Sequence, residues 1–232
     1  MIGRGDSAYV NDASLYDISS YLMIIAAIVK KWGRGDGAIV GKGWGAVMAL
    51  LFLNAVATSI GRIVLADLPL NWDLSADPSI QAALSDSGQP FQSAELALAY
   101  LRQLPEFAGL PENAIPAFLA SHIRASGNHF RLNYDQRLIQ SLSRFAGRSF
   151  DLEALIRKIE APVLLIGGKS GRPPIARQRF YPESTIADLT SDKPVHFALP
   201  RQLLLVLGFL TTAVLPLNPR SDKEHPGNAV PL

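Results

Sequence analysis

The chain has 232 residues, 48% of them hydrophobic and 18% charged, so it can form one domain with a sizeable core. A formal net charge of +2 argues against a nucleic-acid surface, and the absence of cysteine excludes disulfides, thiolate metal sites and cysteine catalysis. Residues 1–7 lack the basic-then-apolar order of a secretory signal, and we therefore expect a cytoplasmic protein.

Two apolar runs, residues 46–60 and 203–217, approach the length of a membrane span. Each is shorter than the ~18 to 20 apolar residues that a spanning helix needs. The first also carries Asn54 and Thr58, and the second is interrupted by Pro216. We interpret both as buried helices, with an interfacial anchor as the alternative for the second.

The first 70 residues alternate between helix and strand. Apolar residues recur at helical spacing over 16–31, and a glycine turn at 33–37 leads into a short buried strand at 38–40. A buried helix at 44–58 and a β-branched strand at 63–66 follow. Strand, tight glycine turn, helix and strand within ~30 residues form a βαβ unit, which predicts a parallel sheet.

The middle of the chain has a different character. Helical segments separated by Pro and Gly turns occupy it, and the one strand-like run lies around 129–132. We expect a helical insertion with helices at 93–104, 112–125 and 136–144. The alternation then resumes with a helix at 151–159, strands at 162–168 and 185–189, and a helix at 199–210.

The most informative motif is the run Gly41-Lys42-Gly43-Trp44-Gly45, between the first strand and the helix after it. A nucleophile elbow has the pattern Gly-x-Ser-x-Gly at such a turn, because the glycines let the backbone bend and let the helix pack closely. Gly41 and Gly45 are the expected elbow glycines. The nucleophile position holds Gly43, which has no side chain to attack a substrate.

Four stretches together resemble the α/β-hydrolase superfamily, specifically bacterial single-domain hydrolases with a helical cap. Residues 3–7 resemble the Gly-x-Gly-x-Ser that follows the third strand in many members, and residues 40–46 lie where the elbow belongs. Residues 151–168 resemble the helix and Pro-Val-Leu-x-x-x-Gly strand that lead to the catalytic acid. Val195-His196-Phe197 resembles the loop that bears the catalytic histidine.

The resemblance implies an α/β fold with a mostly parallel sheet of α/β-hydrolase type and a helical cap. It implies an incomplete core at 1–70 and 149–215, a cap at 71–148 and a disordered tail at 216–232. The family's first strands, and the loop that donates one oxyanion-hole amide, are expected to be missing. A sheet without those strands exposes an edge, so we expect aggregation or a homo-oligomer formed through that edge.

The sequence departs from the family at the residues that perform the chemistry. Gly43 replaces the nucleophile, and residues 169–172 (Lys-Ser-Gly-Arg) stand where the family places the acid. His196 is the remaining triad candidate, Asp67 is a candidate replacement acid at the end of the second strand, and the Trp44 amide is a candidate for half of the oxyanion hole. Trp44 is also a candidate to fill the emptied pocket.

Two functions follow from this pattern. The first is a catalytically degenerate α/β-hydrolase-like protein that binds a small apolar ligand or a protein partner. The alternative is an active hydrolase for an ester-like small molecule, in which His196 activates a water and Asp67 orients His196. We expect no metal and no cofactor. A dinucleotide turn at Gly41, Gly43 and Ala46 is the less favoured interpretation, because the later elements follow the hydrolase order.

Overall fold

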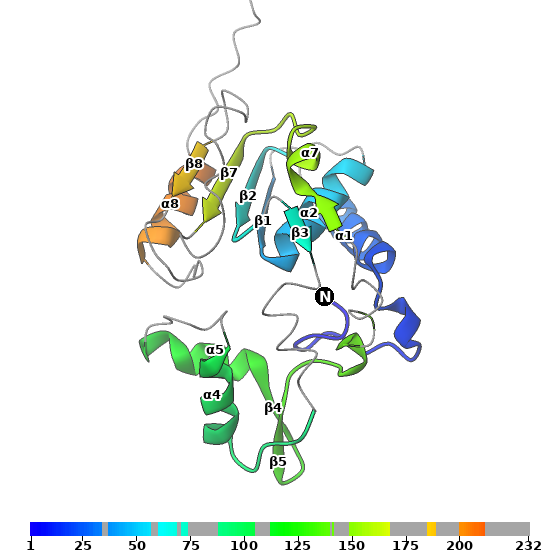
Figure 1. Ribbon diagram of the computed structural model, residues 1–232, viewed down its shortest axis with the longest axis vertical. Helices are drawn as coiled ribbons and strands as arrows, with labels where there is room; N and C mark the ends of the chain where they lie inside the picture. Colours follow the sequence, from blue (N-terminus) through cyan, green and yellow to red (C-terminus); the bar gives the residue numbers. More distant parts are fainter. Residues whose placement is uncertain are drawn as a thin grey trace, which may run out of the picture.

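A four-stranded parallel sheet forms the centre of the computed structural model (Figure 1). The structure describes residues 1–33, 37–56, 60–68, 71–73, 88–104, 112–139, 141, 149–167, 185–188 and 200–211. The strands, in spatial order, are β1 (Ala38–Lys42), β2 (Arg62–Ala66), β7 (Val163–Gly167) and β8 (Thr185–Asp188). All three pairings are parallel, which confirms the predicted α/β class.

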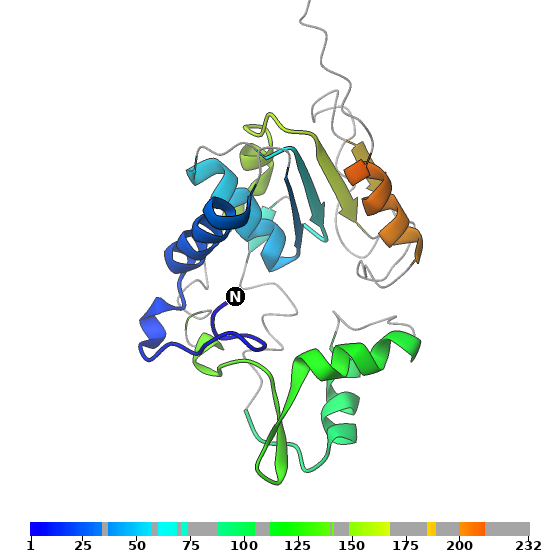
Figure 2. The same cartoon turned by 180° about the vertical axis from the view of Figure 1, so that it is seen from behind.

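Helices cover both faces of this sheet. Alternate residues of β2 and β7 face opposite sides of the sheet. On one side, Ile63 and Leu65 pack with helices α1 (Ile18–Trp32), α2 (Trp44–Ala55) and α7 (Leu152–Ile156). On the other side, Val64 packs with Val206 of helix α8 (Pro200–Thr211). Figure 2 shows α1 and α2 on one side of the sheet and α8 on the other. Because both faces are covered, the central strands are almost continuously apolar, and Ile63 to Ala66 are at most 1% exposed.

The helix boundaries follow from local capping chemistry. Helix α1 begins at Ile18 because the Asp17 carboxylate, at the N-cap, accepts a hydrogen bond of 2.6 Å from the amide of Ser20. The predicted start at residue 16 was two residues early. Helix α2 ends at Ala55 and not at 58, because the β-branched Val56 is extended, with φ −124° and ψ 120°.

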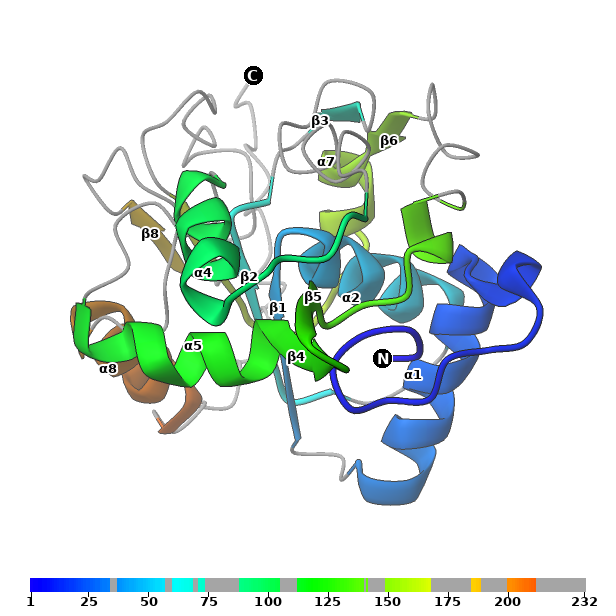
Figure 3. The ribbon, with the colours of Figure 1, turned by 90° about the horizontal axis from the view of Figure 1, so that it is seen from below.

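The described residues between 88 and 141 (88–104, 112–139 and 141), which we call the inserted segment, lie beyond the carboxyl ends of the parallel strands (Figures 1 and 3). The inserted segment contains α4 (Ala94–Gln103), η3 (Glu112–Ala114), α5 (Ile115–His122) and the antiparallel strands β4 (Ile123–Ser126) and β5 (His129–Leu132). A short ribbon of β3 (Asn71–Asp73) and β6 (Ser149–Asp151) pairs the chain before and after it.

The β4–β5 hairpin corrects one prediction. The helix expected at 112–125 ends at His122, and the next four residues form β4. Gly127 has φ 60° in the two-residue turn, a conformation that costs glycine little and lets the two strands pair directly. The helix predicted at 151–159 is also shorter, since α7 ends at Ile156.

The N-terminal loop, residues 1–12, docks onto the inserted segment. The amide of Gly5 donates to the carbonyl of Asn133 at 2.9 Å, and the amide of Asp135 donates to the carbonyl of Gly3 at 2.8 Å. A 3₁₀ turn, η1 (Ala13–Leu15), then leads to α1. Figure 3 shows this loop beside the hairpin.

Among the helices that the structure describes, none combines the length and the apolar character that a bilayer crossing needs. The predicted tail at 216–232 and the loop that carries His196 lie outside the described residues.

Candidate functional site

The turn between β1 and α2 has the backbone geometry of a sharp strand-to-helix elbow. Gly43 occupies the N-cap of α2 with φ 51° and ψ −121°, in the positive-φ region that residues with a side chain rarely adopt. Its amide donates to the carbonyl of Ala66 in β2 at 2.9 Å, and its carbonyl accepts from the amides of Ala46 and Val47 at 3.0 and 3.2 Å. These bonds tie the turn to the neighbouring strand and to the first turn of the helix.

The three glycines of the motif meet different surroundings. A Cβ atom at Gly41 would lie 2.6 Å from the Cα of Ala46 and 2.7 Å from the carbonyl oxygen of Gly45, so this glycine lets the helix approach the strand. A Cβ atom at Gly43 or at Gly45 would meet nothing within 4 Å. The nucleophile position therefore has room for a side chain, although its backbone conformation disfavours one.

Asp67 lies at the same edge of the sheet as the elbow. It follows β2 directly, and the parallel register pairs Lys42 with Ala66, so the residues after these two strands are neighbours. Asp67 has φ 49° and its amide donates to the carbonyl of Ile166 at 2.9 Å. A positive φ is uncommon for a residue with a side chain and is one mark of a functional position.

Trp44 is the first residue of α2 and packs, half-buried, against the core under the helix. Its amide lies at the positive end of the helix dipole, where an oxyanion would be stabilised. The structure thus brings Gly43, Trp44 and Asp67 together at the carboxyl end of the parallel strands, the edge where ligands bind in open α/β sheets. His196 and residues 169–172 lie outside the described residues.

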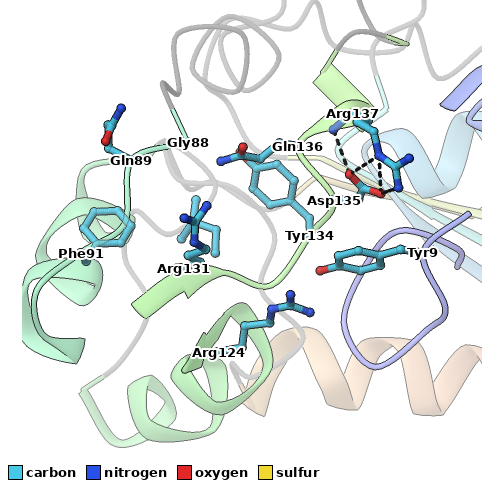
Figure 4. Close-up of a pocket in the computed structure, with 11 residues that line it drawn as sticks. Tyr9, Gly88, Gln89, Phe91, Arg124, Arg131, Tyr134, Asp135, Gln136 and Arg137 are labelled. Carbon is cyan, nitrogen blue, oxygen red and sulfur yellow. Dashed lines mark hydrogen bonds and ion pairs between the residues drawn. The ribbon is translucent and has the colours of Figure 1, made fainter. Parts of the chain in front are cut away.

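A concave region that the sequence did not indicate lies between the N-terminal loop and the inserted segment (Figure 4). This cavity has a volume of about 230 Å³. It does not include the elbow residues. Its lining consists of Tyr9, Gly88, Gln89, Phe91, Arg124, Arg131, Leu132, Tyr134, Asp135, Gln136 and Arg137.

One wall of the cavity is held by a buried carboxylate. The side chain of Asp135 is 7% exposed. It accepts a hydrogen bond of 2.7 Å from the hydroxyl of Tyr16 and forms an ion pair of 2.6 Å with Arg137. Arg137 also donates to the carbonyls of Val10 and Asn11 at 2.7 and 3.1 Å. The three side chains therefore fasten the N-terminal loop to the inserted segment.

The ionisation of this network follows from its contacts. Burial alone would raise the pKa of Asp135, but the hydrogen bonds from Arg137 and Tyr16 outweigh it and lower the pKa from 3.8 to about 2. Burial and the Asp135 carboxylate raise the pKa of the Tyr16 hydroxyl. Asp135 is therefore ionised at neutral pH, with Arg137 as its counter-ion.

The fold has many relatives among solved structures. A hydrolase from Rickettsia typhi superposes with a TM-score of 0.74 at 16% identity, over 90% of this chain and 74% of that one. An alpha/beta hydrolase from Novosphingobium aromaticivorans gives 0.72 at 18% identity, over 90% and 77%. A serine-to-glycine variant of an N-acyl homoserine lactonase, in complex with N-hexanoyl homoserine lactone, gives 0.59 at 14% identity, over 90% and 76%.

No protein-family model and no curated protein matches the chain. The structural similarity, together with the parallel sheet and the glycine elbow, defines the class of protein: the chain has the α/β-hydrolase fold, as the sequence pattern predicted. At these identities the similarity establishes the fold and leaves the reaction to the site.

Proposed function

We propose that this chain is a catalytically degenerate protein with the α/β-hydrolase fold, which binds a small molecule or a protein partner at the elbow instead of carrying out acyl transfer. The observation that carries the proposal is Gly43. It occupies the turn that presents a nucleophile in this fold, with the positive φ of that position and space for a side chain, yet it has none.

The energetic consequence is large. Covalent acyl transfer needs a nucleophile within reach of a base, and loss of the serine in subtilisin lowers kcat about 10⁶-fold. The remaining features of the elbow, the helix dipole and the amide of Trp44, stabilise negative charge on a bound ligand but do not supply a nucleophile. A binding role does not need a nucleophile.

One structural neighbour supports the step from catalysis to binding. The lactonase variant described above lacks a serine side chain and is nevertheless complexed with N-hexanoyl homoserine lactone. A protein with this fold can therefore hold a ligand after replacement of a serine by glycine. We propose a ligand for this chain beside the elbow, at the carboxyl edge of its sheet, without assigning that lactone to it.

A second candidate function, hydrolysis of an ester-like small molecule, rests on Asp67. Its position beside the elbow, with φ 49°, suits an acid that orients a histidine. In this alternative His196 removes a proton from a water molecule as the water attacks the ester carbonyl, and the proton then passes to the leaving alcohol.

Turnover of p-nitrophenyl acetate by purified protein distinguishes the two functions. The wild type is compared with variants Gly43→Ser, His196→Ala and Asp67→Asn. Gly45→Ser is the matched control, because a Cβ atom at Gly45 also meets nothing within 4 Å. The binding proposal expects no turnover above the uncatalysed rate for the wild type or for this control. Wild-type turnover that His196→Ala and Asp67→Asn both abolish would establish the hydrolase instead.

We also propose that the chain self-associates through the outer edge of β1. Among the described strands β1 pairs only with β2, so its other edge meets no strand. Val40 in this strand is 45% exposed, and Met23 and Trp32 on α1 are 72% and 67% exposed. An open edge on a strand that carries an exposed apolar side chain favours pairing with another chain.

A further inference from the structure

Two arginines of the β4–β5 hairpin face the cavity without a counter-ion among the described residues. The register pairs Arg124 directly with Arg131, so the two side chains lie on one face of the hairpin. Neither takes part in an ion pair with any residue that the structure describes. Two like charges directly opposite destabilise a strand pair, so this arrangement needs an explanation beyond the stability of the hairpin.

The other charged groups of the cavity do not neutralise these arginines. Among the lining residues that the structure describes, Asp135 is the one carboxylate, and its oxygens accept hydrogen bonds from Arg137 and Tyr16. Arg137 is held in turn by two backbone carbonyls of the N-terminal loop. The described part of the lining therefore keeps an excess of positive charge at Arg124 and Arg131, both of which are exposed and accessible to a ligand.

Tyr9 supplies a second, independent observation. Its hydroxyl is buried, and no hydrogen-bonding group of the described residues pairs with it. A buried hydroxyl without a partner costs free energy unless a ligand or water satisfies it. The guanidinium of Arg124 lies 5.0 Å from the centre of the Tyr9 ring, and Figure 4 shows the hydroxyl end of Tyr9 turned toward Arg124.

We propose that this cavity binds a small organic carboxylate. The guanidinium groups of Arg124 and Arg131 hold its two oxygens, since the planar fork of arginine matches a carboxylate, and the Tyr9 hydroxyl donates a hydrogen bond to it. The rings of Phe91 and Tyr134, which also line the cavity, pack against a flat or apolar body. A volume of about 230 Å³ suits a molecule of this size.

This site is separate from the elbow, because its lining includes neither Gly43 nor Trp44. The carboxylate proposal therefore stands whether or not the elbow is catalytic. The two proposals can fail separately, since the assay at the elbow measures ester turnover and the assay here measures binding.

Isothermal titration calorimetry with phenylacetate tests the proposal, and phenylacetamide is the uncharged probe of the same shape. We expect the wild type to bind phenylacetate saturably and at least tenfold more tightly than the amide. Arg124→Gln and Arg131→Gln should each weaken phenylacetate binding about tenfold or more. Tyr9→Phe should weaken it severalfold.

Arg102→Gln is the matched control, because Arg102 is a surface arginine outside the cavity that pairs with Glu112. It should bind phenylacetate as the wild type does. Circular dichroism checks folding, and Arg124→Lys, which keeps the charge but loses the fork, replaces Arg124→Gln if that variant unfolds. Equal affinity for acid and amide, binding of inorganic phosphate as tight as that of phenylacetate, or unchanged affinity in both Gln variants would overturn the proposal.

Discussion

Replacement of Asp135 by asparagine tests how the N-terminal loop is held to the inserted segment. The change keeps the shape of the side chain and removes its charge, so the ion pair with Arg137 and the charge-assisted bond from Tyr16 are both weakened. We expect Asp135→Asn to remain folded at neutral pH with a lower free energy of unfolding.

The size of the effect follows from the pKa of Asp135. A pKa of about 2 in the folded protein, against its ordinary value of 3.8, corresponds to about 2 kcal/mol of stability at neutral pH. Because the folded-state pKa is the lower one, this contribution is fully present above about pH 4 and is lost as the pH falls toward 2. About half of it should be gone at pH 3.

Urea denaturation at pH 6 and at pH 3, followed by tryptophan fluorescence, measures the difference in unfolding free energy between wild type and Asp135→Asn. This difference should shrink by about 1 kcal/mol between the two pH values. Glu112→Gln is the control, because the Arg102–Glu112 pair is exposed (48% and 83%) and such pairs contribute about 0–1 kcal/mol. A difference for Asp135→Asn that is the same at both pH values would refute the reasoning.

Two further predictions concern the elbow and the sheet edge. Gly41→Ala should destabilise the fold by about 1–3 kcal/mol in thermal or urea denaturation, since the new Cβ would lie 2.6 Å from the Cα of Ala46. Gly45→Ala, in open space on α2, should instead stabilise it by up to about 1 kcal/mol, and equal effects would contradict the packing argument. Light scattering after size exclusion should show that the wild type forms oligomers and that Val40→Lys is monomeric. The reason is that a lysine on an edge strand prevents pairing with another chain. A monomeric wild type would count against edge pairing.

The elements that sequence predicted correctly are those specified by local pattern. Continuous apolar runs marked β2 and β7 because both faces of these strands are buried. The elbow was recognisable because a sharp turn and a close helix approach demand glycine, and Gly41 and Gly43 meet these two demands in the structure. The absence of a nucleophile at Gly43 can likewise be read directly from the residue itself.

Predictions failed where pairing between segments competes with local propensity. The helix expected to continue to 125 ends at His122, because residues 123–126 pair with 129–132 across a turn at Gly127. The helical spacing of apolar residues over 112–125 does not indicate this pairing, since the hydrogen bonds of a strand depend on its partner.

The sequence by itself therefore determined the α/β class, the order of the strands in the central sheet along the chain and the empty nucleophile position. Only the tertiary structure decided which polar residues act together. Asp135 is an ordinary aspartate in the sequence; in the structure its buried anion is stabilised by Arg137 and by the hydroxyl of Tyr16, which lies 119 positions away along the chain. The carboxylate cavity likewise needs Tyr9 beside Arg124 and Arg131. Periodicity reports local conformation, whereas burial, charge pairing and cavities depend on which distant segments meet when the chain folds.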